Sequence, residues 1–192
     1  MVVGVDRLRT TQVVKQADVL MLGLLLPEEV DAEVQAVNYR YYEPRTSHGS
    51  SLSPAIHALV AARVGDLDDA LAYFHLAGGV DLDNRMGNAA DGVHIATMGG
   101  LWQAAVFGFG GVRADGDAVR IDPRLPPAWP GLSFPVRWRG TRISVDVRAD
   151  VVELDLDAPA RVALGTGPPA DLPGGRFLAR RGEGGWALDA NS

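Results

Sequence analysis

Apolar residues recur at intervals of three and four through the first 109 residues of the chain, a pattern typical of helices that bury one face. Residues that suit helix ends mark the boundaries: Ser53 and Asp66 as N-caps, and Gly65 as a C-terminal stop. The glycine pair at 78–79 also favours a helix end. The predicted helices are residues 11–25, 28–37, 54–64, 67–77 and 93–107.

From residue 110 onward apolar and polar residues alternate, which predicts half-buried strands. The alternation is clearest at residues 118–122, 132–138, 142–148 and 151–156. Arg139-Gly140 and Ala149-Asp150 suit the tight turns of hairpins. These turns would join neighbouring strands, so this part of the chain predicts a small antiparallel sheet.

The two patterns divide the chain into a helical domain, residues 1–109, and an antiparallel β domain, residues 110–165. Residues 166–192 are rich in glycine, proline and charge, with Trp186 as the only large anchor, and we expect a loosely ordered tail there. About five helices, several of them apolar on more than one side, are an awkward number for a free-standing bundle. We therefore expect the helical domain to need further neighbours.

Composition narrows the classes of protein. A length of 192 residues with 47% hydrophobic residues is sufficient for a packed core. The formal net charge of -6 argues against a nucleic-acid or anionic-membrane surface, and the lack of cysteine excludes disulfides and thiol chemistry. The longest apolar stretch, residues 19–26, is too short to span a bilayer, and the N-terminus does not have the pattern of a signal peptide. We expect a cytoplasmic protein.

Residues 41–54, Tyr-Tyr-Glu-Pro-Arg-Thr-Ser-His-Gly-Ser-Ser-Leu-Ser-Pro, bring small hydroxyls, a glycine and a cation to a predicted helix start. The unpaired amides and the positive dipole at a helix N-terminus favour a bound anion, so this segment predicts a phosphate site. Arg45 and Lys15 are the cations that would support it. The alternative is a polar turn with a chance cluster of serines, in which Lys15 extends from a helix edge into solvent.

Other candidate groups give weaker signals. His94 begins the last predicted helix and can donate to an anion or a sugar hydroxyl, or have a purely structural role. The histidines have no paired metal-binding spacing, and Arg85 and Met86 stand where a calcium loop needs an oxygen ligand and a glycine, so no metal site is predicted. Glu43 could act as an acid or base, but we favour an ion pair with Arg45.

Three motifs follow one another along the chain: Lys-Gln-Ala-Asp at 15–18, Tyr-Glu-Pro-Arg-Thr-Ser-His-Gly-Ser-Ser-Leu-Ser at 42–53 and Asp-Gly-Val-His-Ile-Ala-Thr-Met-Gly-Gly-Leu-Trp-Gln at 91–103. In this order they resemble glycoside hydrolase family 65, which includes maltose, trehalose and kojibiose phosphorylases and some related hydrolases. The resemblance covers roughly residues 13–150. It implies the C-terminal portion of an (α/α)6 toroid followed by a small antiparallel β domain.

The resemblance also implies a phosphate site at the bottom of a sugar pocket. In the family, phosphate is bound by the residues that match Lys15, Gly49, Ser50, Ser51 and His94, and the glucosyl unit by the residue that matches Gln16. Inorganic phosphate is then a co-substrate of an α-linked glucose disaccharide such as maltose, trehalose or kojibiose, and no cofactor is implied. Because phosphate is already an anion, it attacks the anomeric carbon without a carboxylate base, and one general acid on the opposite face gives inversion.

One departure from the family bears on activity. The family's general acid is a glutamate in a Gly-Pro-Asp-Glu-Tyr type context upstream of these motifs, and nothing similar occurs here. We therefore expect a C-terminal fragment of an α-glucoside phosphorylase or hydrolase that has no catalytic residue of its own and is inactive alone. Its partner would be the missing N-terminal half or a second copy in a homodimer. The alternative is a non-catalytic remnant or assembly module of the same family.

Overall fold

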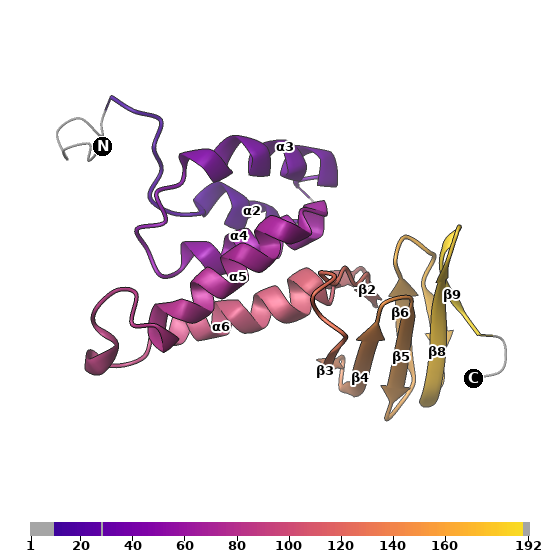
Figure 1. Ribbon diagram of the computed structural model, residues 1–192. Helices are drawn as coiled ribbons and strands as arrows, with labels where there is room; N and C mark the ends of the chain where they lie inside the picture. Colours follow the sequence, from indigo (N-terminus) through magenta and orange to yellow (C-terminus); the bar gives the residue numbers. More distant parts are fainter. Residues whose placement is uncertain (1–9, 28, 190–192) are drawn as a thin grey trace. The chain divides into compact units, whose positions relative to one another are not determined.

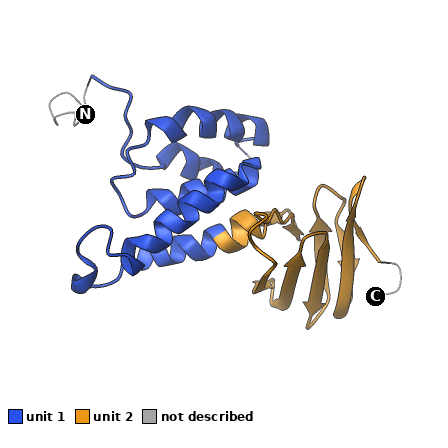
Figure 2. Cartoon of the chain, in the orientation of Figure 1, with its two compact units in different colours: residues 1–104 blue, residues 105–192 orange. Residues whose placement is uncertain are grey.

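The computed structural model describes residues 10–27 and 29–189. Figure 1 shows helices in the first part of the chain and strands in the second. The chain separates into two compact units, residues 1–104 and residues 105–192 (Figure 2). Helices followed by strands are the order that the sequence predicts. None of the described helices is long and apolar enough to cross a membrane.

The first unit is organised around one central helix. The described α-helices of this unit are α2 (Asp18–Leu25), α3 (Ala32–Tyr42), α4 (Ser53–Val64), α5 (Leu67–Leu82) and α6 (Ile95–Gln103). Helix α4 contacts each of the other helices, and its residues 53–62 are all buried. Small side chains permit this, since a Cβ atom added to Gly100 of α6 would come within 2.7 Å of the Ala55 Cβ.

Local signals correctly predict the junction between α4 and α5. Gly65 ends α4 in the left-handed conformation, with φ of 90°, and the Asp66 carboxylate accepts a hydrogen bond from the Asp69 amide at 3.2 Å. The prediction for the start of α4 is wrong, because Ser53 is the first helical residue and not the N-cap. Its buried hydroxyl has no partner among the described residues.

The first two helices begin later than the sequence predicts. Residues before Asp18 are not helical, because Val14 forms a parallel β-bridge with Thr46. Helix α3 begins after Asp31, whose side chain accepts from the Val34 amide at 2.8 Å and caps the helix. Glu28, the predicted start of this helix, lies outside the described residues. In both cases an interaction outside the apolar pattern sets the boundary.

The glycine pair at 78–79 does not end a helix, because α5 continues through it to Leu82. Gly79 is buried, and the Arg85 side chain occupies the space that a Cβ atom there would need. This glycine therefore permits close packing inside a helix. The last predicted helix is α6, and a π-helical stretch, Ala104–Phe109, follows it in the chain.

The second unit contains two sheets. One has the strand order β1 (Val112–Asp115), β2 (Ala118–Ile121), β6 (Ala160–Leu164) and β7 (Ala170–Leu172). The other has the order β3 (Leu132–Trp138), β4 (Thr141–Arg148), β5 (Val151–Leu156), β8 (Gly175–Gly182) and β9 (Gly185–Leu188). All pairs are antiparallel except β2 and β6, which run parallel with Val119 opposite Val162. The predicted single antiparallel sheet is therefore only part of the arrangement.

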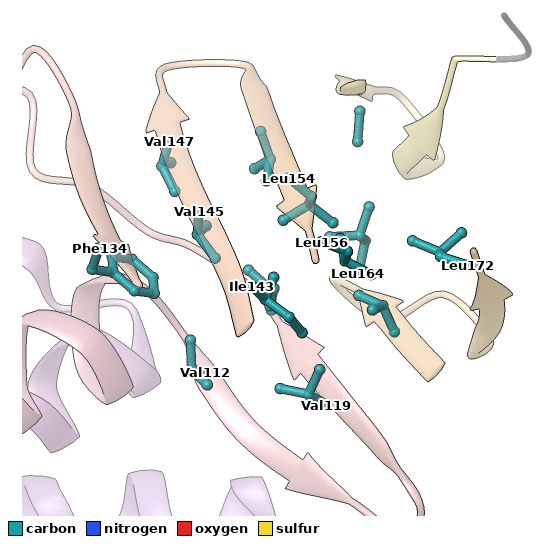
Figure 3. Packing of buried hydrophobic residues seen from close by; sticks show 14 of the residues in the cluster. Val112, Val119, Phe134, Ile143, Val145, Val147, Leu154, Leu156, Leu164 and Leu172 are labelled. Carbon is teal, nitrogen blue, oxygen red and sulfur yellow. The ribbon is translucent and has the colours of Figure 1, made fainter. Parts of the chain in front are cut away.

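Alternating side chains of both sheets form the core of this unit. In β4, Ile143, Val145 and Val147 are buried, while Arg142 is exposed. Figure 3 shows these valines and isoleucine gathered with side chains from the other sheet, including Val119. Arg139 and Gly140, with φ of 47° and 97°, form the predicted turn between β3 and β4.

The expectation of a loosely ordered tail after residue 165 differs from the structure, in which β7, β8 and β9 lie in that region. Trp186 of β9 packs on the core, and a Cβ atom at Gly165 would come within 2.8 Å of its ring. The Arg181 guanidinium lies 4.6 Å from the centre of the same ring. Strand β8 pairs with β5, and this pairing orders a segment whose glycine-rich composition does not indicate a strand.

Candidate functional site

The Lys-Gln-Ala-Asp motif lies beside the Ser-Gly loop because the two segments pair through a short parallel bridge. The Val14 amide donates to the Arg45 carbonyl at 3.0 Å, and the Ser47 amide donates to the Val14 carbonyl at 2.9 Å. Lys15 follows the bridge in one segment and His48 follows it in the other. The bridge therefore brings two motifs that are distant in sequence next to each other.

Gln16 connects the two motifs directly. Its Nε2 atom donates to the Ser50 Oγ atom at 3.2 Å, and the Leu52 amide donates to the same oxygen at 3.4 Å. The Ser53 amide donates to the Ser50 carbonyl, also at 3.4 Å. Ser50 is thus held inside a turn that leads into α4, and Gly49 beside it is exposed.

Lys15 stands out among the cations of the chain. It is the only lysine among the 18 lysine and arginine residues, and its side chain is exposed. A lysine presents a compact charge with three rotatable donors, whereas arginine presents a rigid planar fork. Lys15 can therefore orient its ammonium group toward an anion at the adjacent loop.

His94 is oriented by a carboxylate. The Asp81 Oδ2 atom accepts from the His94 amide at 2.8 Å, and the Oδ1 atom lies 2.5 Å from the His94 Nδ1 atom. These hydrogen bonds lower the pKa of the Asp81 carboxyl group. With Nδ1 turned to Asp81, the Nε2 atom on the other side of the ring is the one that can meet a ligand.

The first turn of α6 is held against the Ser-Gly loop. Thr97 is fully buried, and its hydroxyl donates to the Ser51 carbonyl at 3.0 Å. His94 lies three residues earlier, at the N-terminus of the same helix. The structure therefore connects all three motifs: Gln16 contacts Ser50, and Thr97 contacts Ser51.

A hollow of about 200 Å³ opens beside Gln16. Asp18 contributes a second polar group, and Met21 and Leu52 contribute apolar surface. Mixed polar and apolar walls are typical of sites for small molecules. The position of Gln16 on this wall places it between the hollow and the Ser-Gly loop.

The expected ion pair between Glu43 and Arg45 is absent from the described residues. The Tyr73 hydroxyl donates to the Glu43 Oε1 atom at 2.6 Å instead. Arg45 donates to the Gln12 side chain at 3.1 Å and the Tyr41 carbonyl at 2.6 Å, and its guanidinium lies 4.0 Å from the centre of the Tyr41 ring. Both charges are satisfied by other partners, and Arg45 is directed to Gln12 and Tyr41 and not to the Ser-Gly loop.

Two histidines that are not ligand candidates lie behind the loop. The His48 and His57 rings are 4.5 Å apart, and the His57 Nδ1 atom bonds to the Ser53 carbonyl at 2.9 Å. Burial lowers the pKa of His48, and it lowers the pKa of His57 to about 4. Burial and the Glu43 carboxylate raise the pKa of Tyr73. These groups are therefore neutral near pH 7.

The sequence analysis does not identify Asp81 and Tyr73, which both come from α5. The only signal for Tyr73 is its helical spacing from the buried residues Ala70 and Ala77. The described part of the chain contains no group of three or more histidine, aspartate or glutamate side chains that could hold a metal ion.

Comparisons with known proteins agree with the division of the chain into a helical unit and a β unit. Residues 2–103 match the model of the glycosyl hydrolase family 65 central catalytic domain, and residues 112–165 match the family 65 C-terminal domain. The chain belongs to glycosyl hydrolase family 65. It contains the end of the catalytic domain, with five α-helices among the described residues, followed by the β sheets of the C-terminal domain.

The named relatives include kojibiose and trehalose phosphorylases. The chain is 47% identical to kojibiose phosphorylase of Halothermothrix orenii over 78% of its own length and 19% of that protein. It is 44% identical to α,α-trehalose phosphorylase of Thermoanaerobacter brockii over 73% of its length and 18% of that protein. A solved structure, a putative kojibiose phosphorylase from the human microbiome, superposes with a TM-score of 0.85 at 31% identity, covering 93% of this chain and 25% of the other. The chain thus spans about a fifth of the length of its curated relatives.

Proposed function

We propose that this chain supplies the phosphate-binding half of an inverting α-glucoside phosphorylase that acts on a disaccharide such as kojibiose, trehalose or maltose. The observation that carries the proposal is the pair of hydrogen bonds, Gln16 to Ser50 and Thr97 to Ser51, that joins three motifs at one loop. The relatives named kojibiose phosphorylase and trehalose phosphorylase support phosphorolysis over hydrolysis.

In the proposed site, a phosphate ion lies over the turn before α4. The Lys15 ammonium group supplies positive charge, and His94 pairs with a phosphate oxygen through Nε2 while Asp81 holds Nδ1. The remaining donors are the amides and hydroxyls of residues 49–51. Gln16 contacts the glucosyl unit from the wall of the adjacent hollow.

The reaction needs one proton donor besides this site. A phosphate oxygen bonds to the anomeric carbon from one face while the glycosidic C–O bond breaks on the other, and the departing oxygen takes a proton from a general acid. The products are β-glucose 1-phosphate and the second sugar. Glu43 is not that acid, because it is committed to Tyr73. We assign the acid to the part of the catalytic domain that this chain does not span.

The surface of the helical unit supports a role as part of a larger assembly. Leu25, Leu82 and Ile95 are 69%, 87% and 73% exposed. Among the described residues, the exposed large hydrophobic side chains all lie between residues 13 and 102. Where exposed apolar side chains form a contiguous patch, they mark a surface for contact with other protein. We propose that the remaining helices of the catalytic domain cover them.

Isothermal titration of the chain with inorganic phosphate tests the phosphate site. We expect saturable binding by the wild type, no saturable binding by Lys15→Ala, and near-normal binding by Arg85→Ala, which removes a cation of the same unit that pairs with Asp83. Equal, weak heats for wild type and Lys15→Ala would reject the proposal.

Sedimentation separates the proposed function from a pure assembly module without a phosphate role. Self-association together with saturable phosphate binding fits the proposed function. Self-association with no phosphate binding would favour the assembly module, because the exposed apolar residues of the helical unit would then account for its behaviour in solution.

A further inference from the structure

A chain of hydrogen bonds runs behind the Ser-Gly loop, from Glu43 through Tyr73 to His48. The Tyr73 hydroxyl lies 2.6 Å from the Glu43 Oε1 atom and 3.1 Å from the His48 Nε2 atom. All three residues are partly buried. Tyr73 belongs to α5, so these hydrogen bonds connect a helix to His48, the residue immediately before Gly49.

The positions of the protons follow from donor counting. A carboxylate only accepts, so the single proton of the Tyr73 hydroxyl goes to Glu43. The Tyr73 oxygen must then accept at its other contact, and His48 must donate from Nε2. This fixes one tautomer of His48 and one orientation of its ring. The ring also packs 4.5 Å from His57 and 4.8 Å from Tyr73, measured between ring centres.

The backbone at His48 explains why such a hold is needed. His48 has φ of 49°, in the left-handed region that a non-glycine residue enters only at an energetic cost. This residue turns the chain from the bridge at Thr46 into the Gly49–Ser51 loop. The hydrogen bond to Tyr73 and the ring contacts of His48 offset this cost and keep the turn populated.

We propose that Glu43, Tyr73 and His48 are positioning residues that pin the turn before Gly49 and so orient the loop for phosphate. None of the three touches the ion. Their role in phosphate binding rests on the proposed function, whereas their role in holding the loop rests on the geometry alone.

The test compares two tyrosine variants in the full chain. Tyr73→Phe removes the link to His48, while Tyr39→Phe removes a similar hydrogen bond, 3.2 Å from the Tyr39 hydroxyl to Asp69 on the same α5 helix. NMR of each protein gives the order of the Gly49–Ser51 backbone and the tautomer of His48. Isothermal titration gives the affinity for inorganic phosphate.

We expect Tyr73→Phe to lower the order of residues 49–51, to lose the single His48 tautomer and to bind phosphate about tenfold more weakly, as for loss of a hydrogen bond to a charged group. Tyr39→Phe should leave all three unchanged. Glu43→Gln, which keeps an acceptor for Tyr73, should stay near the wild type, whereas Glu43→Ala should behave like Tyr73→Phe.

The outcomes separate this inference from the proposed function. Unchanged loop order and an unchanged His48 tautomer in Tyr73→Phe would overturn the positioning role, whatever the phosphate data show. Normal phosphate affinity of Tyr73→Phe beside clear binding by the wild type would also overturn it and leave the phosphate site standing. Absence of binding by the wild type would reject the proposed function, and the NMR measurements would still decide the positioning role.

Discussion

Replacing His57 by leucine is expected to remove most of the acid sensitivity of the helical unit. His57 is fully buried in α4, where its ring lies 5.2 Å from that of Tyr73 and 6.3 Å from that of Tyr39. Its Nδ1 atom faces the Ser53 carbonyl, and its Nε2 atom has no partner among the described residues. A positive charge on this ring would therefore be buried without a compensating acceptor at Nε2.

The magnitude follows from the difference between the folded and unfolded states. Burial lowers the pKa of His57 from 6.5 to about 4, so the unfolded chain binds the proton more readily than the folded chain. The stability that neutral His57 contributes is fully present above pH 6.5 and is lost as the pH falls toward about 4. The full loss is about 3 kcal/mol, since one pH unit of difference corresponds to about 1.4 kcal/mol. Burial also lowers the pKa of His48, which adds to the loss in the same direction.

The carboxyl groups change the stability of the folded state in other parts of the pH range, or change it in the opposite direction to His57. The lowered pKa values of Asp81 and Asp146 affect stability only as the pH falls below about 3.8. Burial raises the pKa of Asp69, so its proton stabilises the folded state at low pH. Because wild type and His57→Leu share these groups, their contributions cancel in the difference between the two proteins.

The assay is urea unfolding followed by the circular dichroism of the helices, at several values from pH 7 to about pH 4. The wild type should lose about 3 kcal/mol more than His57→Leu over this range. His75→Leu, which replaces a histidine of α5, is the control and should follow the wild type. Parallel curves for wild type and His57→Leu would refute the assignment of the acid sensitivity to this ring.

Further variants test individual elements. Asp66→Ala should destabilise the helical unit by about 1 kcal/mol in urea unfolding because α5 loses its cap, whereas exposed Asp68→Ala should change stability by less than about 0.5 kcal/mol; equal effects would contradict the capping role. Gly111→Ala should destabilise the β unit by at least about 2 kcal/mol in thermal unfolding, because the added Cβ would overlap the Asp122 carbonyl. Gly116→Ala is the control, since Gly116 has a similar positive φ but open space around it, and this variant should destabilise the unit less. Asp81→Ala should weaken phosphate binding about tenfold in calorimetry because the His94 ring loses its partner, with exposed Asp83→Ala as the control; unchanged affinity would argue against the role of His94.

Local chemistry made part of the fold predictable. Glycine at 65 and 140 permits the positive φ that each turn needs, and Asp66 caps a helix, so the sequence alone locates these two junctions. The limits of other elements depend on distant contacts. The bridge between Val14 and Thr46 and the parallel pairing of β2 with β6 join segments that carry no sign of each other in the sequence.

The candidate site likewise contains residues that the sequence predicts and residues that it does not. Lys15, Gln16, the Ser-Gly loop and His94 lie in recognisable motifs, and the contacts of Gln16 and Thr97 are consistent with their grouping. Tyr73 comes from the middle of α5 and Asp81 from its last turn, and neither matches a motif, because their roles depend on which helix packs against the loop. Glu43 lies within a motif, but its true partner is 30 residues away in sequence and could not be inferred from its neighbours.

The most direct test of the phosphate site uses the fact that Lys15 is the only lysine in the chain. An amine-reactive acylating reagent can modify only Lys15 and the N-terminal amine, and mass spectrometry of the peptides gives the rate at each. Inorganic phosphate should slow the modification of Lys15 in a saturable way, while chloride at equal ionic strength should not, and the rate at the N-terminus should be the same in both salts. Equal Lys15 rates in phosphate and chloride would contradict the claim that this chain carries the phosphate half of the active site.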